Sequence, residues 1–340
     1  MNKLTKKKHF VGVDISKSTL DLSLTEEETF GHFFDKKIEN SISGFDSILQ
    51  WLKKHKKKPE DCVFCMEHTG TYGLLFFFWL SQMGIDYCVE PGIHIKRSMG
   101  LTRSKNDKVD ARRIAEYAYT NKIKLKTFSL PSTLIVKIKQ LLTYREQTIR
   151  IRTSLKNSLK SHEQYQKISG LTLVTETIKE QIEQQNSLID TIENQIVEII
   201  KSDSQLEKNY ELVTSVKGIG FVIAAFMLVT TNNFTSFNDG RKYACYSGIA
   251  PFENTSGTTI KGKTKVSNLG NKTMKTLLTN GANSAATWDP ELKAYYNRKE
   301  KEGKGHQLII NSIRCKLVNR VFAVIKRQTP YVRLHQHNFA

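Results

Sequence analysis

The central part of this chain contains almost no residue that interrupts a helix. No proline occurs between Pro131 and Pro251, and from Pro131 to Gly218 the only glycine is Gly170. Proline and glycine are the residues that most disfavour a helix interior. A stretch of this length with a single glycine and no internal proline therefore predicts long helices. The single glycine predicts two helices that turn near Gly170.

The second of these predicted helices carries a heptad seam. Apolar residues recur at alternating spacings of four and three, with one glutamine in the series: Ile178, Ile182, Gln185, Ile189, Ile192, Ile196 and Ile199. This period is typical of a coiled coil. Residues 132–170 carry a net charge of +6 and residues 171–217 of −5, so we expect two antiparallel helices of complementary charge. A helical hairpin within one globular chain and a coil that binds a partner explain the pattern equally well.

Before Pro131 the pattern changes to short strands and helices. Strands are expected at 10–14, 20–24, 29–38, 63–67 and 85–89, and helices at 43–56, 72–83 and 106–120. Three strands in a meander followed by alternating helices and strands are the element order of a ribonuclease-H-like fold, although many α/β proteins share part of this order.

Four acidic residues stand at element ends in this region. Asp14 closes an apolar strand, Glu67 follows another, and Asp107 and Asp110 lie three apart, so they share one face of a helix. Clustered carboxylates repel one another unless a divalent cation neutralises them, and Mg²⁺ prefers such oxygen ligands. Two such ions can stabilise the attacking and leaving oxygens of a phosphodiester displacement. Taken one at a time, each acid is better explained as a solvated or ion-paired surface residue; taken together, they favour a metal site.

The charge balance predicts a polyanionic partner. The 340 residues include 52 Lys and Arg against 33 Asp and Glu, a net charge of +19. Residues 218–340 hold 18 bases and 6 acids, a net +12, compared with +6 for residues 1–131 and +1 for residues 132–217. Cations at this density attract phosphates and release condensed counterions. The last third of the chain is therefore expected to contribute most to nucleic-acid binding.

Targeting and redox signals point to the cytoplasm. No apolar run approaches the ~18 residues that a membrane span needs, and no apolar segment follows the basic N-terminus as in a signal peptide. The five cysteines are odd in number and scattered, which argues against a disulfide framework. Cys62 and Cys65 form a CxxC, but no second pair completes a zinc site. In a strand, residues three apart point to opposite faces, so buried thiols are the better interpretation.

After Gly218 the sequence predicts a compact, mainly helical domain. The segment 216–220, Val-Lys-Gly-Ile-Gly, precedes an apolar helix and resembles the hairpin of a helix-hairpin-helix element. Glycine permits the turn there, and free backbone N–H groups can meet a DNA phosphate.

Further along, Ser256-Gly257 leads into a lysine-rich segment that we expect to be a basic loop. A serine hydroxyl can attack phosphorus if its proton is removed and the phosphoryl charge is neutralised. By itself, a Ser-Gly pair is more often part of an ordinary loop.

In this order, the motifs closely resemble the insertion-sequence 110 family of transposases over nearly the whole chain. They are Val11-Gly12-Val13-Asp14-Ile15-Ser16-Lys17, Glu67-His68-Thr69-Gly70, Asn106-Asp107-Lys108-Val109-Asp110-Ala111-Arg112, Val216-Lys217-Gly218-Ile219-Gly220, Tyr246-Ser247-Gly248-Ile249-Ala250-Pro251, Thr255-Ser256-Gly257 and Leu269-Gly270-Asn271-Lys272. One departure is Lys217, which stands where such hairpins often have proline.

The resemblance implies an α/β part followed by an all-α part. Residues 1–130 would form a ribonuclease-H/RuvC-like DEDD catalytic domain. Residues 131–211 would form an antiparallel helical coiled coil, and residues 212–340 a mainly helical C-terminal transposase domain with a helix-hairpin-helix-like element.

The resemblance also implies the reaction, which is the cutting and rejoining of DNA through a covalent serine-DNA phosphodiester intermediate. The DEDD carboxylates that bind Mg²⁺ would be Asp14, Glu67, Asp107 and Asp110. The nucleophile would be Ser256, chosen because it directly precedes Gly257. Ser247 and Thr255 offer neighbouring hydroxyls and remain alternatives.

The implied partners are target and donor DNA and a non-coding bridge RNA that pairs with both. Family members form homodimers that assemble into homotetramers, and the acidic site and the serine that work together come from different protomers. The implied setting is the bacterial cytoplasm, in association with the nucleoid. Candidate nucleic-acid contacts are Lys105, Lys108, Arg112, Arg113, Lys217, Gly218, Gly220, Lys261, Lys263, Lys265, Lys272 and Lys275.

Two other functions compete with this interpretation. A RuvC-type, Mg²⁺-dependent junction nuclease would use activated water and would leave Ser256 without a role. A non-catalytic nucleic-acid-binding protein would need neither metal nor Ser256.

Overall fold

The computed structural model describes residues 3–68, 70–98, 106–256 and 260–332, without the side chains of residues 254–256, 260, 261 and 263. The chain divides into two compact units, Met1–Leu130 and Pro131–Ala340. None of the helices in the described ranges is long and apolar enough to cross a membrane.

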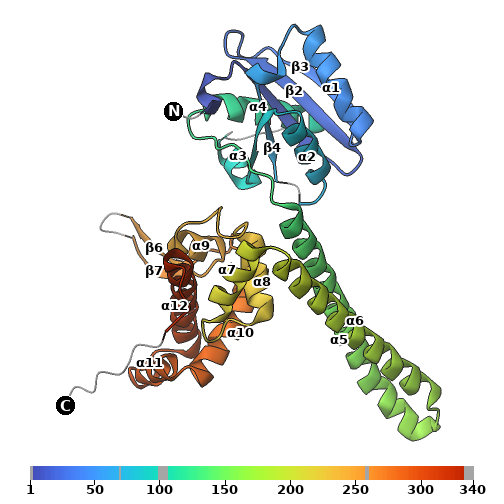
Figure 1. Cartoon of the computed structure of the whole chain (residues 1–340), viewed down its shortest axis with the longest axis vertical. Helices are drawn as coiled ribbons and strands as arrows, with labels where there is room; N and C mark the ends of the chain where they lie inside the picture. Colours follow the sequence, from blue (N-terminus) through green and yellow to red (C-terminus); the bar gives the residue numbers. More distant parts are fainter. Residues whose placement is uncertain (1–2, 69, 99–105, 257–259, 333–340) are drawn as a thin grey trace. The chain divides into compact units, whose positions relative to one another are not determined.

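The first unit is built on a mixed five-stranded sheet of order β3-β2-β1-β4-β5 (Figure 1). Its strands are β1 (His9–Ile15), β2 (Thr19–Glu26), β3 (Phe34–Glu39), β4 (Cys62–Glu67) and β5 (Asp86–Glu90). The first three strands pair antiparallel, whereas β4 runs parallel to β1 and β5 runs parallel to β4. This meander followed by parallel crossovers is the ribonuclease-H-like order that the sequence predicts.

Helices cover both faces of this sheet. They are α1 (Ile42–Lys54), α2 (Leu74–Gln82), α3 (Gly92–Ser98) and α4 (Asp107–Thr120), with 3-10 turns at Lys3–Lys6 and Pro59–Asp61. Val11 and Val13 of β1 pack with α1 and α2 on one face, and Phe10 packs with α3 and α4 on the other. Because both faces are covered, β1 and β4 consist largely of buried apolar residues.

The thiols of β4 lie in these two cores. Cys62 and Cys65 are fully buried, Cys62 on the α1 and α2 face and Cys65 on the α3 and α4 face. Burial raises the pKa of the Cys62 thiol to about 12, which keeps it protonated. The prediction of buried thiols on opposite faces is therefore confirmed.

The second unit begins with a long helical hairpin, α5 (Thr133–Ser169) and α6 (Leu173–Lys201), whose helices lie side by side in Figure 1. The turn is at Gly170, which has a positive φ of 71°. Arg145 Nε donates to Glu193 Oε1 at 2.7 Å near the base, and Thr175 Oγ1 donates to Gln166 Oε1 at 2.8 Å near the tip. These pairs fix an antiparallel register.

The isoleucine seam of α6 is buried as predicted, except at its end. The buried members are Ile178, Ile182, Ile189, Ile192, Ile196 and Ile200. Ile199, the predicted last member, is half-buried and packs against the same core, while Ile200 beside it is fully buried. The helical hairpin agrees with the sequence, while supercoiling of its helices stays a prediction.

The rest of the second unit is mainly helical. Its elements are α7 (Ser204–Thr214), α8 (Phe221–Thr230), α9 (Gly240–Tyr246), β6 (Pro251–Ser256), β7 (Ile260–Val266), α10 (Lys272–Trp288), α11 (Pro290–Lys301) and α12 (His306–Arg327). The base of the helical hairpin shares a core with α8, where Ile138 and Ile196 pack with Leu228. The segment expected to be a basic loop is instead the antiparallel β6-β7 hairpin followed by the first turns of α10.

Candidate active site

Asp14 and Glu67 lie on neighbouring parallel strands, at the same end of the sheet. Val13 is in register with Met66, so Asp14 and Glu67 are the next residues along β1 and β4. Alternate residues of a strand share a face. Asp14 therefore shares the face of Phe10, and Glu67 that of Cys65, which is the face covered by α3 and α4.

Gly12 brings α4 against this face. A Cβ atom on Gly12 would lie 2.1 Å from the carbonyl oxygen of Ala111 and 2.3 Å from the backbone nitrogen of Ala115. Only glycine permits such an approach of strand to helix. Asp107 and Asp110 occupy the first turn of α4, immediately before this contact. The packing at Gly12 thus positions both acids relative to Asp14.

The pKa of Asp14 responds to the other three carboxylates. Its pKa is raised from 3.8 to about 6, first by burial and then by the negative charges of Asp107 and Asp110, with smaller contributions from Asp21 and Glu67. An acid surrounded by other acids resists ionisation. All four acids that the sequence suggested therefore belong to the same region of the first unit, close enough for the other three to affect the ionisation of Asp14.

Asp21 is a fifth carboxylate that sequence reasoning missed. It lies on β2 directly opposite Asp14 in the antiparallel ladder, and its Oδ2 is 3.1 Å from Lys37 Nζ. The short connection between β1 and β2 could have predicted this position, because it sets the register that places Asp21 beside Asp14.

The basic side chains that lie among these acids form ion pairs with nearby carboxylates. Arg113 contacts Asp110 at 2.9 Å, and Lys108 Nζ lies 3.0 Å from Asp35 Oδ2 of β3. Arg112 Nε donates to the other oxygen of Asp35 at 3.0 Å. Although burial opposes it, hydrogen bonds from Arg112 and Lys108 hold the pKa of Asp35 below its ordinary value.

Lys108 and Arg112 thus fasten α4 to β3. Their expected contacts with nucleic acid stay a prediction, and Lys105 lies outside the described residues.

Glu67 lies against the start of α3. A Cβ atom on Gly92 would fall 1.8 Å from Glu67 Oε1.

Within the described ranges, no three His, Cys, Asp or Glu side chains are placed to hold a metal ion as they stand. The donor set consists of carboxylate oxygens, which suits a hard divalent cation, and the raised pKa of Asp14 marks negative charge that such a cation would neutralise.

In the second unit, Ser256 is the last residue of β6 and is in register with Ile260 of β7. Its side chain, like those of Thr255, Lys261 and Lys263, lies outside the described part. Lys265 is exposed on β7. Ser247, the other alternative nucleophile, is fully buried, and its Oγ donates to the Tyr243 carbonyl at 2.8 Å. A hydroxyl held in the core in this way cannot reach a DNA strand.

The geometry of the turn between α7 and α8 requires glycine at position 218. Its φ is 96°, and a Cβ atom there would lie 2.7 Å from the Gly281 carbonyl oxygen of α10. Lys217 and Gly220 are exposed beside it. A helix-hairpin-helix role in phosphate binding stays a prediction for this turn.

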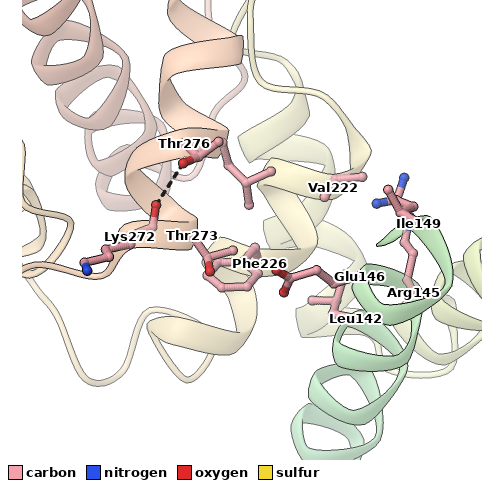
Figure 2. A pocket seen from close by; sticks show the side chains of 10 residues that line it. Leu142, Arg145, Glu146, Ile149, Val222, Phe226, Lys272, Thr273 and Thr276 are labelled. Carbon is pink, nitrogen blue, oxygen red and sulfur yellow. Dashed lines mark hydrogen bonds between the residues drawn. The ribbon is translucent and has the colours of Figure 1, made fainter. Parts of the chain in front are cut away.

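A cavity of about 330 Å³ lies between α5, α8 and α10 (Figure 2). Leu142, Phe226 and Leu277 contribute to its largely apolar lining. Lys272 stands at the start of α10 on its wall and is exposed, and its backbone carbonyl accepts a hydrogen bond from Thr276 Oγ1 at 3.1 Å. Lys275, one turn along, is half-buried.

A ribonuclease-H-like sheet that carries Asp14 and Glu67 at one end, together with a basic helical unit, is consistent with a DNA transposase or recombinase. A family model described as a transposase, of the DEDD IS110 type, matches residues 11–164. A second, described as the transposase IS116/IS110/IS902 family, matches residues 210–297. The chain belongs to the insertion-sequence 110 family of transposases, enzymes of DNA recombination.

Individual relatives agree with this assignment. The chain is 25% identical over 334 residues to the pilin gene-inverting protein of Moraxella bovis, covering 97% of this chain and 99% of the relative. The protein of the same name from Moraxella lacunata matches to the same extent. An uncharacterized 43.6 kDa protein of insertion element IS110 from Streptomyces coelicolor is 32% identical over 120 residues, covering 35% of this chain and 29% of the relative.

Proposed function

We propose that this transposase cuts and rejoins DNA through a covalent bond between Ser256 and a DNA phosphate. The observation that carries the proposal is the position of Asp14 and Glu67 at one end of neighbouring strands, near the first turn of α4 with Asp107 and Asp110. Burial and then the charges of these acids raise the pKa of Asp14 to about 6. Strongly perturbed carboxylates of this kind are typical of catalytic sites. Ser256 adds a hydroxyl at the end of a hairpin in the more basic part of the chain.

The proposed reaction conserves phosphodiester bonds. The Ser256 hydroxyl loses its proton and its oxygen forms a bond to phosphorus, while the bond from phosphorus to one deoxyribose oxygen breaks and that oxygen takes up a proton. A hydroxyl of another strand then attacks the serine-bound phosphate, and Ser256 regains its proton. Because each step exchanges one ester for another, rejoining needs no external energy source.

The names of two relatives support such an exchange. The Moraxella proteins are named for inverting a pilin gene, and the inversion of a DNA segment requires every broken strand to be rejoined. Simple hydrolysis by activated water would leave strands that need a separate ligation.

Asp14, Glu67, Asp107 and Asp110 are the residues that would hold Mg²⁺. The ion, when bound, would neutralise phosphoryl charge and favour the ionised form of an attacking hydroxyl. Asp14 and Glu67 stand on the neighbouring strands β1 and β4, and Asp107 and Asp110 in the first turn of α4.

Sequence recognition is assigned in this proposal to a bridge RNA that pairs with target and donor DNA. Base pairing can read the DNA sequence while the protein binds the nucleic-acid backbones. Backbone binding requires positive charge and little base-specific contact. The net charge of +12 on residues 218–340 supports such binding. The protein would act as a homodimer that assembles into a homotetramer, which light scattering with and without RNA would test.

The deciding experiment looks for the covalent adduct. Purified protein is incubated with Mg²⁺, with RNA transcribed from the DNA that flanks the gene, and with nicked DNA carrying the flanking sequences. Denaturing gels then show whether DNA migrates with protein. We expect an adduct that Ser256→Ala abolishes and that Thr264→Ala, an exposed hydroxyl on the same hairpin, leaves unchanged.

A second pair of substitutions tests the acidic site. Asp107→Asn combined with Asp110→Asn should abolish Mg²⁺-dependent chemistry and leave RNA binding within about threefold, because RNA contacts depend on the cations. Cleavage without an adduct that Ser256→Ala does not affect would contradict the proposal and indicate a water-using nuclease. Full activity of the double variant would contradict the assignment of the metal ligands.

A further inference from the structure

Two sequence motifs that the proposed chemistry does not use meet at the base of the β6-β7 hairpin. The first, Tyr246-Ser247-Gly248, ends α9 and leads into β6. The second, Leu269-Gly270-Asn271, follows β7 and leads into α10. The chain therefore enters and leaves the hairpin through these two motifs.

The two motifs cross in direct backbone contact at a pair of glycines. A Cβ atom on Gly270 would lie 2.2 Å from the Cα of Gly248 and 2.3 Å from its nitrogen. A Cβ atom on Gly248 would lie 3.1 Å from the Cα of Gly270, and the φ of Gly248 is 65°. Any side chain at position 270 must push the entering and leaving segments apart.

Asn271 ties the same crossing with hydrogen bonds. Its backbone nitrogen donates to the Tyr246 carbonyl at 2.7 Å, and its Nδ2 donates to Tyr246 Oη at 2.9 Å. Its Oδ1 accepts from the Met274 nitrogen at 2.9 Å and so caps α10. The Tyr246 ring packs on Tyr243 and Phe237, with centroids 5.6 and 5.4 Å away. Both ends of the hairpin are thereby fixed to the core.

A third fastening comes from α12. Asn311 Nδ2 donates to the Ile249 carbonyl at 3.0 Å, one residue after Gly248. The first pair of the hairpin, Pro251 with Val266, follows directly.

Beyond this base, the hairpin contacts chiefly itself and extends away from the helices (Figure 1). Phe252 is 48% exposed, and Glu253, Thr264 and Lys265 are exposed as well. Five residue steps separate Pro251 from Ser256, which makes a lever of roughly 17 Å. A rotation of roughly 10° at its base would move the tip by roughly 3 Å, and a misplacement of about 1 Å can cost about 100-fold in rate.

We propose that the crossing of Gly248 and Gly270, braced by Tyr246 and Asn271, is a base clamp that positions Ser256 for reaction. This inference rests on the proposed role of Ser256. The four residues are positioning residues, since they act through the geometry of the hairpin.

The kinetic test uses the full-length protein with the RNA and nicked DNA described above, under single-turnover conditions at saturating DNA. Gly270→Ala should slow adduct formation by at least about 100-fold, and Tyr246→Phe, which removes one hydroxyl, by about 5- to 20-fold. The dissociation constant for DNA should change less than about threefold in both, because no phosphate-binding group is lost. Gly305→Ala is the matched control, since a Cβ atom there meets nothing within 4 Å.

A distance measurement tests the clamp without any reaction. Spin labels are attached through noncanonical amino acids at Thr264 of β7 and Lys293 of α11, both exposed. The distance distribution between them should be broader or shifted in Gly270→Ala and in Tyr246→Phe, and unchanged in Gly305→Ala. If Gly270→Ala does not fold, Tyr246→Phe decides the outcome.

The outcomes separate the two proposals. Wild-type rates or wild-type distance distributions in folded clamp variants would overturn the clamp. A wild-type protein that forms no Ser256-dependent adduct would overturn the proposed function, and the spin-label distances would still report whether the four residues hold the hairpin.

Discussion

The acidic cluster of Asp14, Glu67, Asp107 and Asp110 is held in a different way from the serine hairpin, the β6-β7 hairpin that carries Ser256. Asp14 and the first turn of α4 are held by backbone packing at Gly12, inside a core covered on both faces. Ser256 ends the first strand of a two-stranded hairpin that is fastened at its base, and Phe252, Glu253, Thr264 and Lys265 of this hairpin are exposed.

The difference follows from charge. The pKa of Asp14 is raised first by burial and then by the negative charges of neighbouring carboxylates, and both effects oppose its ionisation in the folded protein. A stiff framework is needed to hold them, and the sheet and α4 provide it. A serine hydroxyl is neutral and repels nothing, so it needs accurate direction and little surrounding structure. The three predictions below test this contrast.

The largest effect is expected at Gly12. In Gly12→Ala the new methyl group would lie 2.1 Å from the Ala111 carbonyl oxygen, so α4 must move away from β1. We expect a loss of about 3 kcal/mol in the free energy of unfolding and at least a 100-fold loss of Mg²⁺-dependent adduct formation. Chemical denaturation and the adduct assay measure the two effects.

Val11→Ala is the matched control, because Val11 lies on the other face of β1. It should cost about 2 kcal/mol through its cavity and keep near wild-type activity in conditions where it is folded. Equal losses of activity in both variants would mean that the cluster depends only on overall stability.

A smaller effect, of opposite sign for stability, is expected at Asp14. Asp14→Asn should abolish activity and yet raise the free energy of unfolding of the metal-free protein at pH 7.5 by about 1–2 kcal/mol, a value reduced for partial exposure of the carboxyl. The pKa of Asp14 is higher in the folded state, about 6, than its ordinary 3.8. The wild-type side chain therefore favours folding most below pH 3.8 and loses this contribution as pH rises through 6.

Denaturation with a chelator present, at pH 4 and at pH 7.5, checks the sign. The stability difference between Asp14→Asn and wild type should be close to zero at pH 4 and clear at pH 7.5. A variant less stable than wild type at pH 7.5 would show that Asp14 is not under electrostatic strain.

The smallest effect is expected on the hairpin. Phe252→Ser should change the free energy of unfolding by less than about 0.5 kcal/mol, because Phe252 is 48% exposed and the hairpin is separate from the core. Phe10→Ser, in the fully buried sheet core, should cost about 3–5 kcal/mol by comparison. A large loss in the Phe252 variant would show that the hairpin contributes to the helical core.

Much of the first unit follows from local sequence pattern. Apolar runs ending in Asp14 and Glu67 predict β1 and β4, and the acids then fall at one end because parallel strands share direction. The third strand begins at Phe34 and not at residue 29, since residues 28–31 form a turn and the pairing with β2 starts at Phe34. Gly12 could not be assigned its role from sequence, because the contact with Ala111 spans many residues of chain.

The β6-β7 hairpin escaped prediction for a different reason. Among the described side chains of β6 and β7, none belongs to a hydrophobic core cluster, and residues 251–266 carry no apolar alternation and resemble a basic loop. The pairing of Lys108 and Arg112 with Asp35 is equally hidden, because it joins side chains more than 70 residues apart. Sequence pattern reveals elements that bury one face. It does not reveal elements that are held by a few long-range contacts.

The crossing of Gly248 and Gly270 also bears on how this domain can change. Since the chain arrives and departs at nearly one point, the residues between form an appendage that can be lengthened, shortened or exchanged while α9 and α10 keep their places. A graft of a relative's hairpin between these two glycines would exchange the segment that carries Ser256 as a single module.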